Sequence, residues 1–179
     1  LLTANNHCLD RGKKGMERTI QLLDSSGIRY AGTYKNLSER RQRYPLFINR
    51  NGFRIALLNY TYGTNGIKAT SPNIVNYIDK NTILQDIQSA KARQPDACMH
   101  WGEEYQSLPN REQRELANWL LQQGVTHIIG SHPHVIQPME LRTNGTEQHI
   151  IVYSLGNFIS NMSKANTDGG LIFTLQLEK

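Results

Sequence analysis

The chain has 179 residues, of which 38% are hydrophobic and 20% are charged, values ordinary for one soluble globular domain with a buried core. Its formal net charge is +5, yet no nucleic-acid-binding motif and no basic stretch interleaved with aromatic residues occurs, so nucleic acid is excluded as a partner. No apolar run reaches the ~18 residues that a transmembrane helix needs, and two cysteines are too few for a disulfide scaffold.

The first half of the chain predicts a helix, a hairpin and a long loop. Leu1 to Ala4 has the pattern of the end of a buried strand, from which we expect the sequence to be a fragment lacking its first strands. Apolar residues at helical spacing predict a helix over 15–25, and Asn51-Gly52 predicts a tight turn between strands over 46–49 and 53–60. Weaker patterns predict a short strand over 28–32, a surface turn or short helix over 36–43, and a loop over 63–73.

The second half alternates helices with short apolar strands. Thr82 with Gln85, and Asn110 with Gln113, have the spacing of capping boxes, which predicts one helix from Thr82 to about Arg93 and another after Asn110. Strands are expected over 97–101, 125–129, 150–155 and 171–177. This alternation predicts a single α/β domain over residues 1–179, with helices packed on the sheets.

Two histidines follow the strand predicted over 125–129. Pro133 disfavours helical backbone at His132, so we expect an extended segment in which His132 and His134 project to the same face. Two convergent imidazoles at a strand end suit a transition-metal ion. The alternative is a pair of surface histidines in a polar loop, and the pair by itself leaves both interpretations open.

Polar residues of the same kind end three further apolar segments. They are Ala-Asn-Asn-His-Cys-Leu-Asp over 4–10, His-Trp-Gly-Glu-Glu-Tyr over 100–105 and Tyr-Ser-Leu-Gly-Asn-Phe over 153–158. Taken singly, each has a structural explanation, because a lone histidine is more often a satisfied core residue, acids favour helix N-termini, and Gly and Asn form turns. Four such endings together favour a functional site, since loops converge above the strand ends of α/β proteins.

The four motifs, in this order, resemble the signature of the CapA/PgsA family, which is named for bacterial poly-γ-glutamate capsule synthesis and is similar to the calcineurin-like metallophosphoesterases. The resemblance runs from Ala4 to Phe158 and includes Ile-Gly-Ser-His-Pro-His-Val-Ile-Gln-Pro-Met-Glu over 129–140. It implies a two-sheet β-sandwich flanked by helices, with a metal site at the strand ends. It also implies an extracytoplasmic, membrane-associated location for the intact protein.

The resemblance assigns roles to individual residues. The positions that match metal ligands of the phosphoesterase pattern are Asn6, His100, His132 and His134, the last two with Ser131 inserted after Gly130. His7 matches the histidine that contacts the scissile group, and Asp10 is placed with it as a catalytic residue. The residues that belong to the capsule-family signature, and are assigned to substrate binding, are Glu103, Glu104, Tyr105 and Asn157.

The cofactor that the resemblance implies is a divalent metal, Mn, Fe or Zn, in a site that is dinuclear in the intact protein. Imidazole nitrogens and amide carbonyl oxygens suit these ions, but a second ion needs bridging carboxylates. The aspartate motifs that supply those carboxylates in phosphoesterases precede the Asn-His motif, and this sequence begins after them. We therefore expect at most one weakly held ion in this chain.

Two functions are compatible with these motifs. The first is a metal-dependent hydrolase or transferase in capsule or poly-γ-glutamate production, acting on a polyanionic polymer or its precursor together with other capsule-synthesis proteins at the membrane. The alternative is a non-catalytic assembly or export component. A weaker third possibility is polyanion binding by the basic clusters Lys13-Lys14 and Arg40-Arg41 with Arg43. The bond acted on, a phosphoester or a γ-glutamyl amide, stays open.

Overall fold

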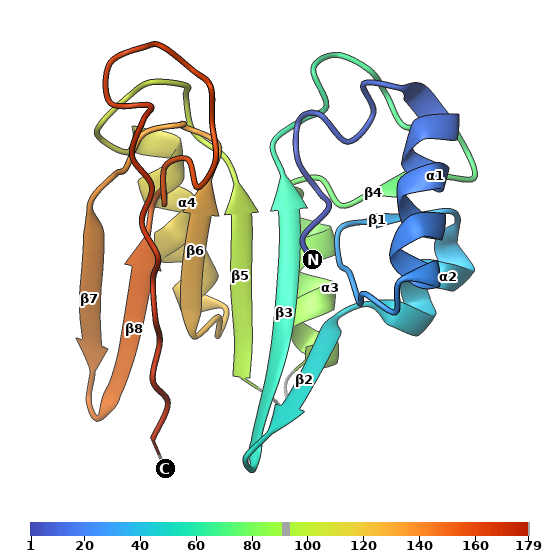
Figure 1. Cartoon of the computed structure of the whole chain (residues 1–179). Coiled ribbons are helices and arrows are strands. Elements are labelled where there is room, and N and C mark those ends of the chain that lie inside the picture. Colours follow the sequence, from blue (N-terminus) through green and yellow to red (C-terminus); the bar gives the residue numbers. More distant parts are fainter. Residues whose placement is uncertain (91–93, 179) are drawn as a thin grey trace.

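The computed structural model describes residues 1–90 and 94–178 as a six-stranded sheet with a two-stranded ribbon and helices beside it (Figure 1). The large sheet has the strand order β2-β3-β5-β6-β8-β7. Its strands are β2 (Leu46–Arg50), β3 (Phe53–Thr61), β5 (Gln94–His100), β6 (His127–Ser131), β7 (Met139–Asn144) and β8 (Glu147–Val152). The ribbon pairs β1 (Thr33–Tyr34) with β4 (Ile74–Val75).

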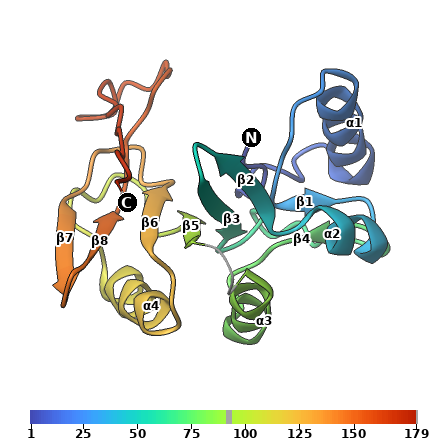
Figure 2. The same cartoon turned by 90° about the horizontal axis from the view of Figure 1, so that it is seen from below.

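The four central strands, β3, β5, β6 and β8, run parallel, while the edge strands β2 and β7 pair antiparallel with their neighbours. Strand β3 is connected to β5 through α3 (Lys80–Ala90), and β5 is connected to β6 through α4 (Arg111–Gln122). Both helices lie on the same face of the sheet (Figure 2), as expected when crossovers share one handedness. As a result β3, β5, β6 and β8 all end at one edge of the sheet, the upper edge in Figure 1.

The main core lies between the sheet and helices α3 and α4. Leu58, Ile128 and Ile151 from the sheet are fully buried in one cluster with Ile83 and Leu120 from the helices. Burying one such side chain contributes about 1.5–3 kcal/mol, so this layer holds the parallel strands rigidly beneath the edge where they end.

A second layer lies beside β3, where α1 (Gly12–Ser25) and α2 (Leu37–Arg43) flank the ribbon (Figure 1). Helix α1 buries Met16, Ile20 and Leu23, the residues whose spacing predicted it. Helix α2 is tied to α3 by Arg40, which forms a paired set of hydrogen bonds with the buried Asp86 at 2.7 and 3.2 Å. No helix in the described part of the chain is long and apolar enough to span a bilayer.

The α/β class predicted from the sequence is confirmed, as two unequal sheets with helices beside them. The hairpin around Asn51-Gly52 is confirmed, and both of its turn residues have the positive φ that a two-residue turn demands. The capping box of Asn110 and Gln113 is also confirmed, since both of its reciprocal hydrogen bonds are present.

Several element predictions were wrong. Asp79, and not Thr82, caps α3, because the Thr82 backbone N–H donates to the Asp79 carboxylate at 2.8 Å; the predicted helix end near Arg93 lies outside the described residues. The strand expected over 28–32 is reduced to a single bridge between Leu2 and Ala31. Strand β7 was missed, although the Gly145-Thr146 turn that joins it to β8, with a positive φ at Gly145, is a readable hairpin signal.

The strand expected over 171–177 has the predicted burial alternation but is not a strand. Leu171, Phe173 and Leu175 are half-buried while the residues between them are exposed. A strand requires a neighbouring backbone, and among the described residues the backbone of this segment has only the hydrogen bond from the Leu171 N–H to the Leu155 carbonyl. The alternation of side chains therefore correctly predicted which residues of 171–177 are partly buried. The segment is not a strand, because in the described part of the chain its backbone forms no ladder with a neighbouring strand.

Candidate metal centre

Three imidazoles meet at the carboxyl edge of the parallel strands. His100 is the last residue of β5, and His132 and His134 follow directly after β6, which pairs in parallel with β5. The ring centroids of His100 and His132 are 4.7 Å apart, and those of His132 and His134 are 6.0 Å apart. The parallel register thus brings together side chains that are more than thirty positions apart in the chain.

The backbone that presents His132 and His134 is not the extended segment predicted from Pro133. His132 has φ +106° and His134 has φ +61°, both in a region that non-glycine residues rarely adopt. A residue of another loop holds this turn in place, because the Tyr105 N–H donates to the Pro133 carbonyl at 2.7 Å. The convergence of the two imidazoles is therefore produced by a strained turn, and strain of this kind clusters at functional sites.

His132 is the buried member of the group, with 7% of its surface exposed. Its Nδ1 atom has no hydrogen-bond partner among the described residues, and an unsatisfied buried polar atom is costly. Burial lowers the pKa of His132, an effect that the nearby Glu104 carboxylate opposes in part. A neutral imidazole with a free lone pair is the form that binds a metal ion.

Glu104, His132 and His134 form a group whose potential ligand atoms all lie within 4.8 Å of one another. Ligands of one tetrahedral ion at about 2.1 Å lie roughly 3.4 Å apart, so the three residues are close to the spacing that a bound ion requires. Two imidazoles and a carboxylate are a donor set suited to Zn, Mn or Fe. The residues present therefore fit a divalent ion.

Asn157 is not a member of the three-ligand group but forms a hydrogen bond with one member, His134. Its amide nitrogen donates to the Thr167 carbonyl at 3.0 Å, which leaves its amide oxygen to accept from Nδ1 of His134 at 2.9 Å. That bond fixes the His134 tautomer and leaves Nε2 free, the arrangement typical of metal-bound histidines. Asn157 was predicted to bind substrate; the structure places both polar atoms of its amide in contacts with protein.

Asn6 and His100 form a second pair of ligand-type atoms, since the Asn6 amide oxygen lies 2.8 Å from Nε2 of His100. Two ligands of one ion at a right angle are about 3 Å apart, so this geometry is compatible with a shared ion as well as with a direct hydrogen bond. Asn6 is held there because the buried Asn59 on β3 accepts from the Ala4 N–H at 2.8 Å and donates to the Cys98 carbonyl. The N-terminal segment is thereby fastened across β3 and β5.

The electrostatic environment keeps His100 neutral. Burial lowers its pKa to about 3, and the neighbouring histidines His132, His134 and His7 add to the effect because their charged forms would repel a proton on His100. His100 is therefore unprotonated at any pH near neutrality, as a metal ligand must be.

His7 and Asp10 lie together at the exposed rim of the site. Nδ1 of His7 is 2.8 Å from the Asp10 carboxylate, and 59% and 48% of the two side chains are exposed. The carboxylate orients the ring and leaves Nε2 open to solvent. Asn65 connects this pair to the buried ligands, since its amide oxygen accepts from Asn6 at 3.1 Å and its amide nitrogen is 3.3 Å from His7.

Tyr62 and Asn65 are the site residues that sequence reasoning missed. The Tyr62 ring lies 4.7 Å from His132 and is stacked at 6.2 Å on His100. Burial and the Glu104 carboxylate raise the pKa of Tyr62, so its hydroxyl stays protonated and able to donate a hydrogen bond. A signal existed, because Tyr62 follows β3 at the same edge as the other motifs.

The remaining predicted site residues, Glu103 and Tyr105, lie on either side of Glu104 in the chain. Glu103 is exposed and accepts a hydrogen bond from Asn110 at 3.1 Å, while Tyr105 stacks on His134 at 6.0 Å. A hydrogen bond to Glu104 raises the pKa of Tyr105. In the basic cluster over 40–43, Arg40 is paired with Asp86 and Arg43 with Asp24.

This fold and this edge of polar residues define an α/β domain with a candidate metal centre at the carboxyl ends of its parallel strands, and comparison with known proteins makes the class specific. Residues 1–162 match the family model described as "Bacterial capsule synthesis protein PGA_cap". The chain belongs to this family.

Two curated relatives are similar over nearly the whole chain. The first is "PGA biosynthesis protein CapA" of Bacillus subtilis (strain 168), 32% identical over 184 residues that cover 100% of this chain and 47% of the relative. The second is "Capsule biosynthesis protein CapA" of Bacillus anthracis, 33% identical over 179 residues that cover 94% of this chain and 42% of the relative. The chain therefore spans less than half the length of the curated relatives it matches.

Proposed function

We propose that this chain carries the metal-dependent hydrolytic or transfer centre of a capsule or poly-γ-glutamate biosynthesis protein, with Glu104, His132 and His134 holding a divalent ion. The observation that carries the proposal is that His132, one of the group of three ligand residues, has a buried Nδ1 with no partner in the described part of the chain. Such an atom is rarely left unpaired unless an ion or water occupies the site.

The sequence predicted at most one weakly held ion in this chain; we go beyond that prediction and propose Asn6 and His100 as ligands of a second ion beside the first. Their 2.8 Å separation and the unprotonated state of His100 support this assignment. When bound, divalent ions at such a site activate a water molecule and neutralise charge that develops on the bond being broken. Asn157 acts as a positioning residue, because it fixes the tautomer of His134.

His7, oriented by Asp10, is proposed as the acid that delivers a proton to the leaving group. Its Nε2 is open to solvent, and its ring is linked through Asn65 to the ligand Asn6. Tyr62 and Tyr105 flank the histidines and are proposed to contact the substrate. The polymer or its precursor, other capsule-synthesis proteins and an extracytoplasmic, membrane-associated location are proposed as the setting, on the strength of family membership.

The test is metal binding and hydrolysis by the same protein samples. The metal-stripped chain is titrated with Zn²⁺ and Mn²⁺ in a calorimeter, alongside the double variant His132→Ala, His134→Ala and the control His149→Gln, whose histidine lies at the opposite edge of the sheet. We expect the double variant to lose at least 100-fold in affinity and the control to bind normally. Equal metal affinities of the double variant and the wild type would rule out the proposed metal centre.

Assays of hydrolysis distinguish the proposed enzyme from the alternative, a non-catalytic assembly or export component. Bis(p-nitrophenyl) phosphate and γ-glutamyl-p-nitroanilide report phosphoester and γ-glutamyl amide cleavage, respectively. Turnover of either compound that depends on added metal and on His7 supports the enzyme. Tight metal binding without turnover of either compound favours the alternative, in which the ion stabilises a component of an assembly or export complex.

A further inference from the structure

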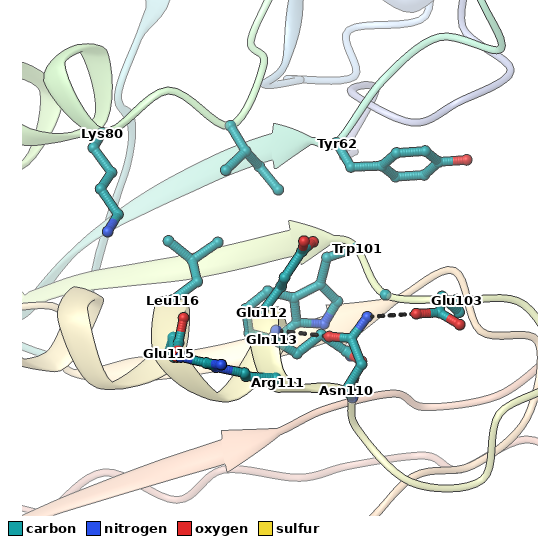
Figure 3. A pocket seen from close by; sticks show the side chains of 12 residues that line it. Tyr62, Lys80, Trp101, Glu103, Asn110, Arg111, Glu112, Gln113, Glu115 and Leu116 are labelled. Atoms are coloured by element: carbon teal, nitrogen blue, oxygen red, sulfur yellow. Dashed lines mark hydrogen bonds and ion pairs between the residues drawn. The ribbon is translucent and has the colours of Figure 1, made fainter.

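A pocket of about 720 Å³ lies between the N-terminal ends of α3 and α4 (Figure 3). Charged side chains on its walls contact other parts of the same chain: Arg111 bonds to Glu115 at 2.6 Å, and the Lys80 ammonium lies over the Trp119 ring at 5.3 Å. None of the described side chains that line the pocket has a buried polar atom without a partner. The pocket therefore contains no group that needs a ligand, whereas the outer edge of β7 carries a row of unpaired backbone groups.

Strand β7 is the outermost strand of the large sheet on the β8 side, as two views of the molecule show (Figure 1, Figure 2). A two-residue turn joins it to β8, so Asn144 and Glu147 form the hydrogen-bonded pair that closes the hairpin. Hydrogen-bonded pairs alternate with non-hydrogen-bonded pairs along an antiparallel ladder. The backbone N–H and C=O groups of Met139, Leu141 and Thr143 consequently point away from β8.

In the described part of the chain, no residue outside the hairpin forms a hydrogen bond with these outward groups. The opposite edge of the sheet differs, because the same alternation turns the Phe47 carbonyl of β2 outward and the Arg29 guanidinium donates to it at 2.8 Å. Side chains on the β7 edge are also uncovered, with Met139 51% and Leu141 62% exposed. An exposed edge with apolar side chains is a template for pairing with another strand.

The order of charges along β7 makes the strand complementary to itself. When two identical strands pair antiparallel about a two-fold axis, residues at equal distances on either side of the axis face each other. An axis through Leu141 places Glu140 of each copy opposite Arg142 of the other, and brings the outward groups of Leu141 to their own equivalents. An axis through Glu140 or Arg142 would place like charges opposite each other, which is unfavourable.

We propose that β7 is a dimerisation edge, at which two copies of this chain join their sheets by antiparallel pairing of β7 with β7 about an axis through Leu141. The charged side chains are held in place beforehand, since Arg142 donates to Glu140 at 2.9 Å and also to Asn118 of α4. Such preorganisation lowers the entropic cost of association. Pairing at one strand edge buries less surface than a standard interface, so the dissociation constant should be about 10–100 µM.

Sedimentation velocity over roughly 2–400 µM protein, which brackets that dissociation constant, measures the association. Leu141→Pro removes the outward N–H but leaves the bonds to β8, and it should weaken the dimer at least about tenfold. Arg142→Glu places a carboxylate opposite Glu140 on both sides of the axis and should also weaken it about tenfold. Combining Glu140→Arg with Arg142→Glu restores opposite charges and should restore the dimer. Lys14→Glu, on the exposed part of α1, is the matched control for net charge.

Oxidation of single-cysteine substitutions tests the position of the axis. The two copies of residue 141 would form a hydrogen-bonded pair with Cα atoms about 5.5 Å apart, within the range of a disulfide. The two copies of residue 143 would be ~13 Å apart, which is too far. With oxidised glutathione, Leu141→Cys should therefore form a covalent dimer and Thr143→Cys should not. Wild type treated in the same way measures any contribution of Cys8 and Cys98.

Urea unfolding of every variant confirms that it is folded, and Arg142→Glu tests the interface independently if Leu141→Pro is not. A chain that stays monomeric at all these concentrations overturns the proposal, whether the edge is simply solvated or pairs with a different protein. Dimerisation that neither Leu141→Pro nor Arg142→Glu weakens assigns the interface to another face and overturns it as well. Equal cross-linking of Leu141→Cys and Thr143→Cys rejects the axis through Leu141.

Discussion

The two edges of the parallel sheet both carry histidines and carboxylates, but they use them differently. At the amino-terminal edge, Nδ1 of His127 accepts from the Ile150 N–H at 3.2 Å, and Nδ1 of His149 donates to the Thr126 carbonyl at 3.0 Å. Asp96 accepts from the His127 N–H at 3.2 Å. At the carboxyl-terminal edge, Nδ1 of the buried His132 has no partner in the described part of the chain, and the turn that holds it is strained.

The comparison shows how to separate structural histidines from candidate ligands. The Nδ1 atoms of His127 and His149 are satisfied by backbone hydrogen bonds, and the described residues place no group of three ligand-type side chains around them. A histidine that is buried, neutral and unpaired costs stability unless a ligand compensates for it. The predictions that follow test this distinction, beginning with the largest effect.

Gly130→Ala should cost the most, about 4 kcal/mol or more of unfolding free energy. Gly130 precedes the histidine turn, and a Cβ at this position would overlap the Tyr153 carbonyl and the Trp101 indole nitrogen, which are hydrogen-bonded to each other at 2.9 Å. Urea unfolding measures the loss. Gly63→Ala, where an added Cβ meets no atom within 4 Å, is the control and should change stability by less than about 0.5 kcal/mol. Equal stabilities of the two variants would show that the close approach at Gly130 is not required.

Asp96→Asn should raise stability at high pH by about 4 kcal/mol. Burial raises the pKa of Asp96 to about 7, and the carboxyl is 8% exposed. Because the folded state holds this proton more tightly than the unfolded state, the contribution of Asp96 is fully present below pH ~4 and is lost as pH rises to about 7.

The measurement is urea unfolding of wild type and Asp96→Asn at pH 4 and pH 8. The difference between the two proteins isolates Asp96 from His127, whose pKa is lowered by burial and which titrates in the opposite sense. We expect the variant to gain at pH 8 and not at pH 4. The same gain at both pH values would mean that protonation of Asp96 does not contribute to the pH dependence of stability.

Asn157→Ala should weaken metal affinity about tenfold, equivalent to about 1.4 kcal/mol, without abolishing it. The variant removes the bond that fixes the His134 tautomer but leaves Glu104, His132 and His134 in place. Zn²⁺ titration measures the loss, and Asn157→Asp, which keeps an acceptor oxygen, should restore most of the affinity. Unchanged Zn²⁺ affinity of Asn157→Ala would show that Asn157 does not position His134 for metal binding.

His149→Gln should give the smallest effect, about 1 kcal/mol of unfolding free energy and no change in metal affinity. It removes one hydrogen bond to the Thr126 carbonyl at the amino-terminal edge. Urea unfolding and Zn²⁺ titration are carried out on the same preparation. A loss of metal affinity in this variant would break the distinction between the two edges.

Local sequence patterns predicted the parts of this molecule that short-range physics controls. The spacing of Met16, Ile20 and Leu23 predicted α1, the turn residues Asn51-Gly52 predicted the hairpin, and Asn110 with Gln113 predicted the start of α4. Each depends on contacts between residues a few positions apart, which the sequence displays directly.

The sequence by itself also determined which residue types end the strands, and so identified Asn6, His100, His132 and His134 as residues to examine. Only the tertiary structure decided that these residues meet, because parallel pairing of β5 with β6 sets their separation. It also decided that His132 is presented by a turn of positive φ, that Asn157 lies behind His134, and that Tyr62 joins the group. Those contacts join segments far apart in the chain, where strand register and burial, and not local propensity, set the geometry.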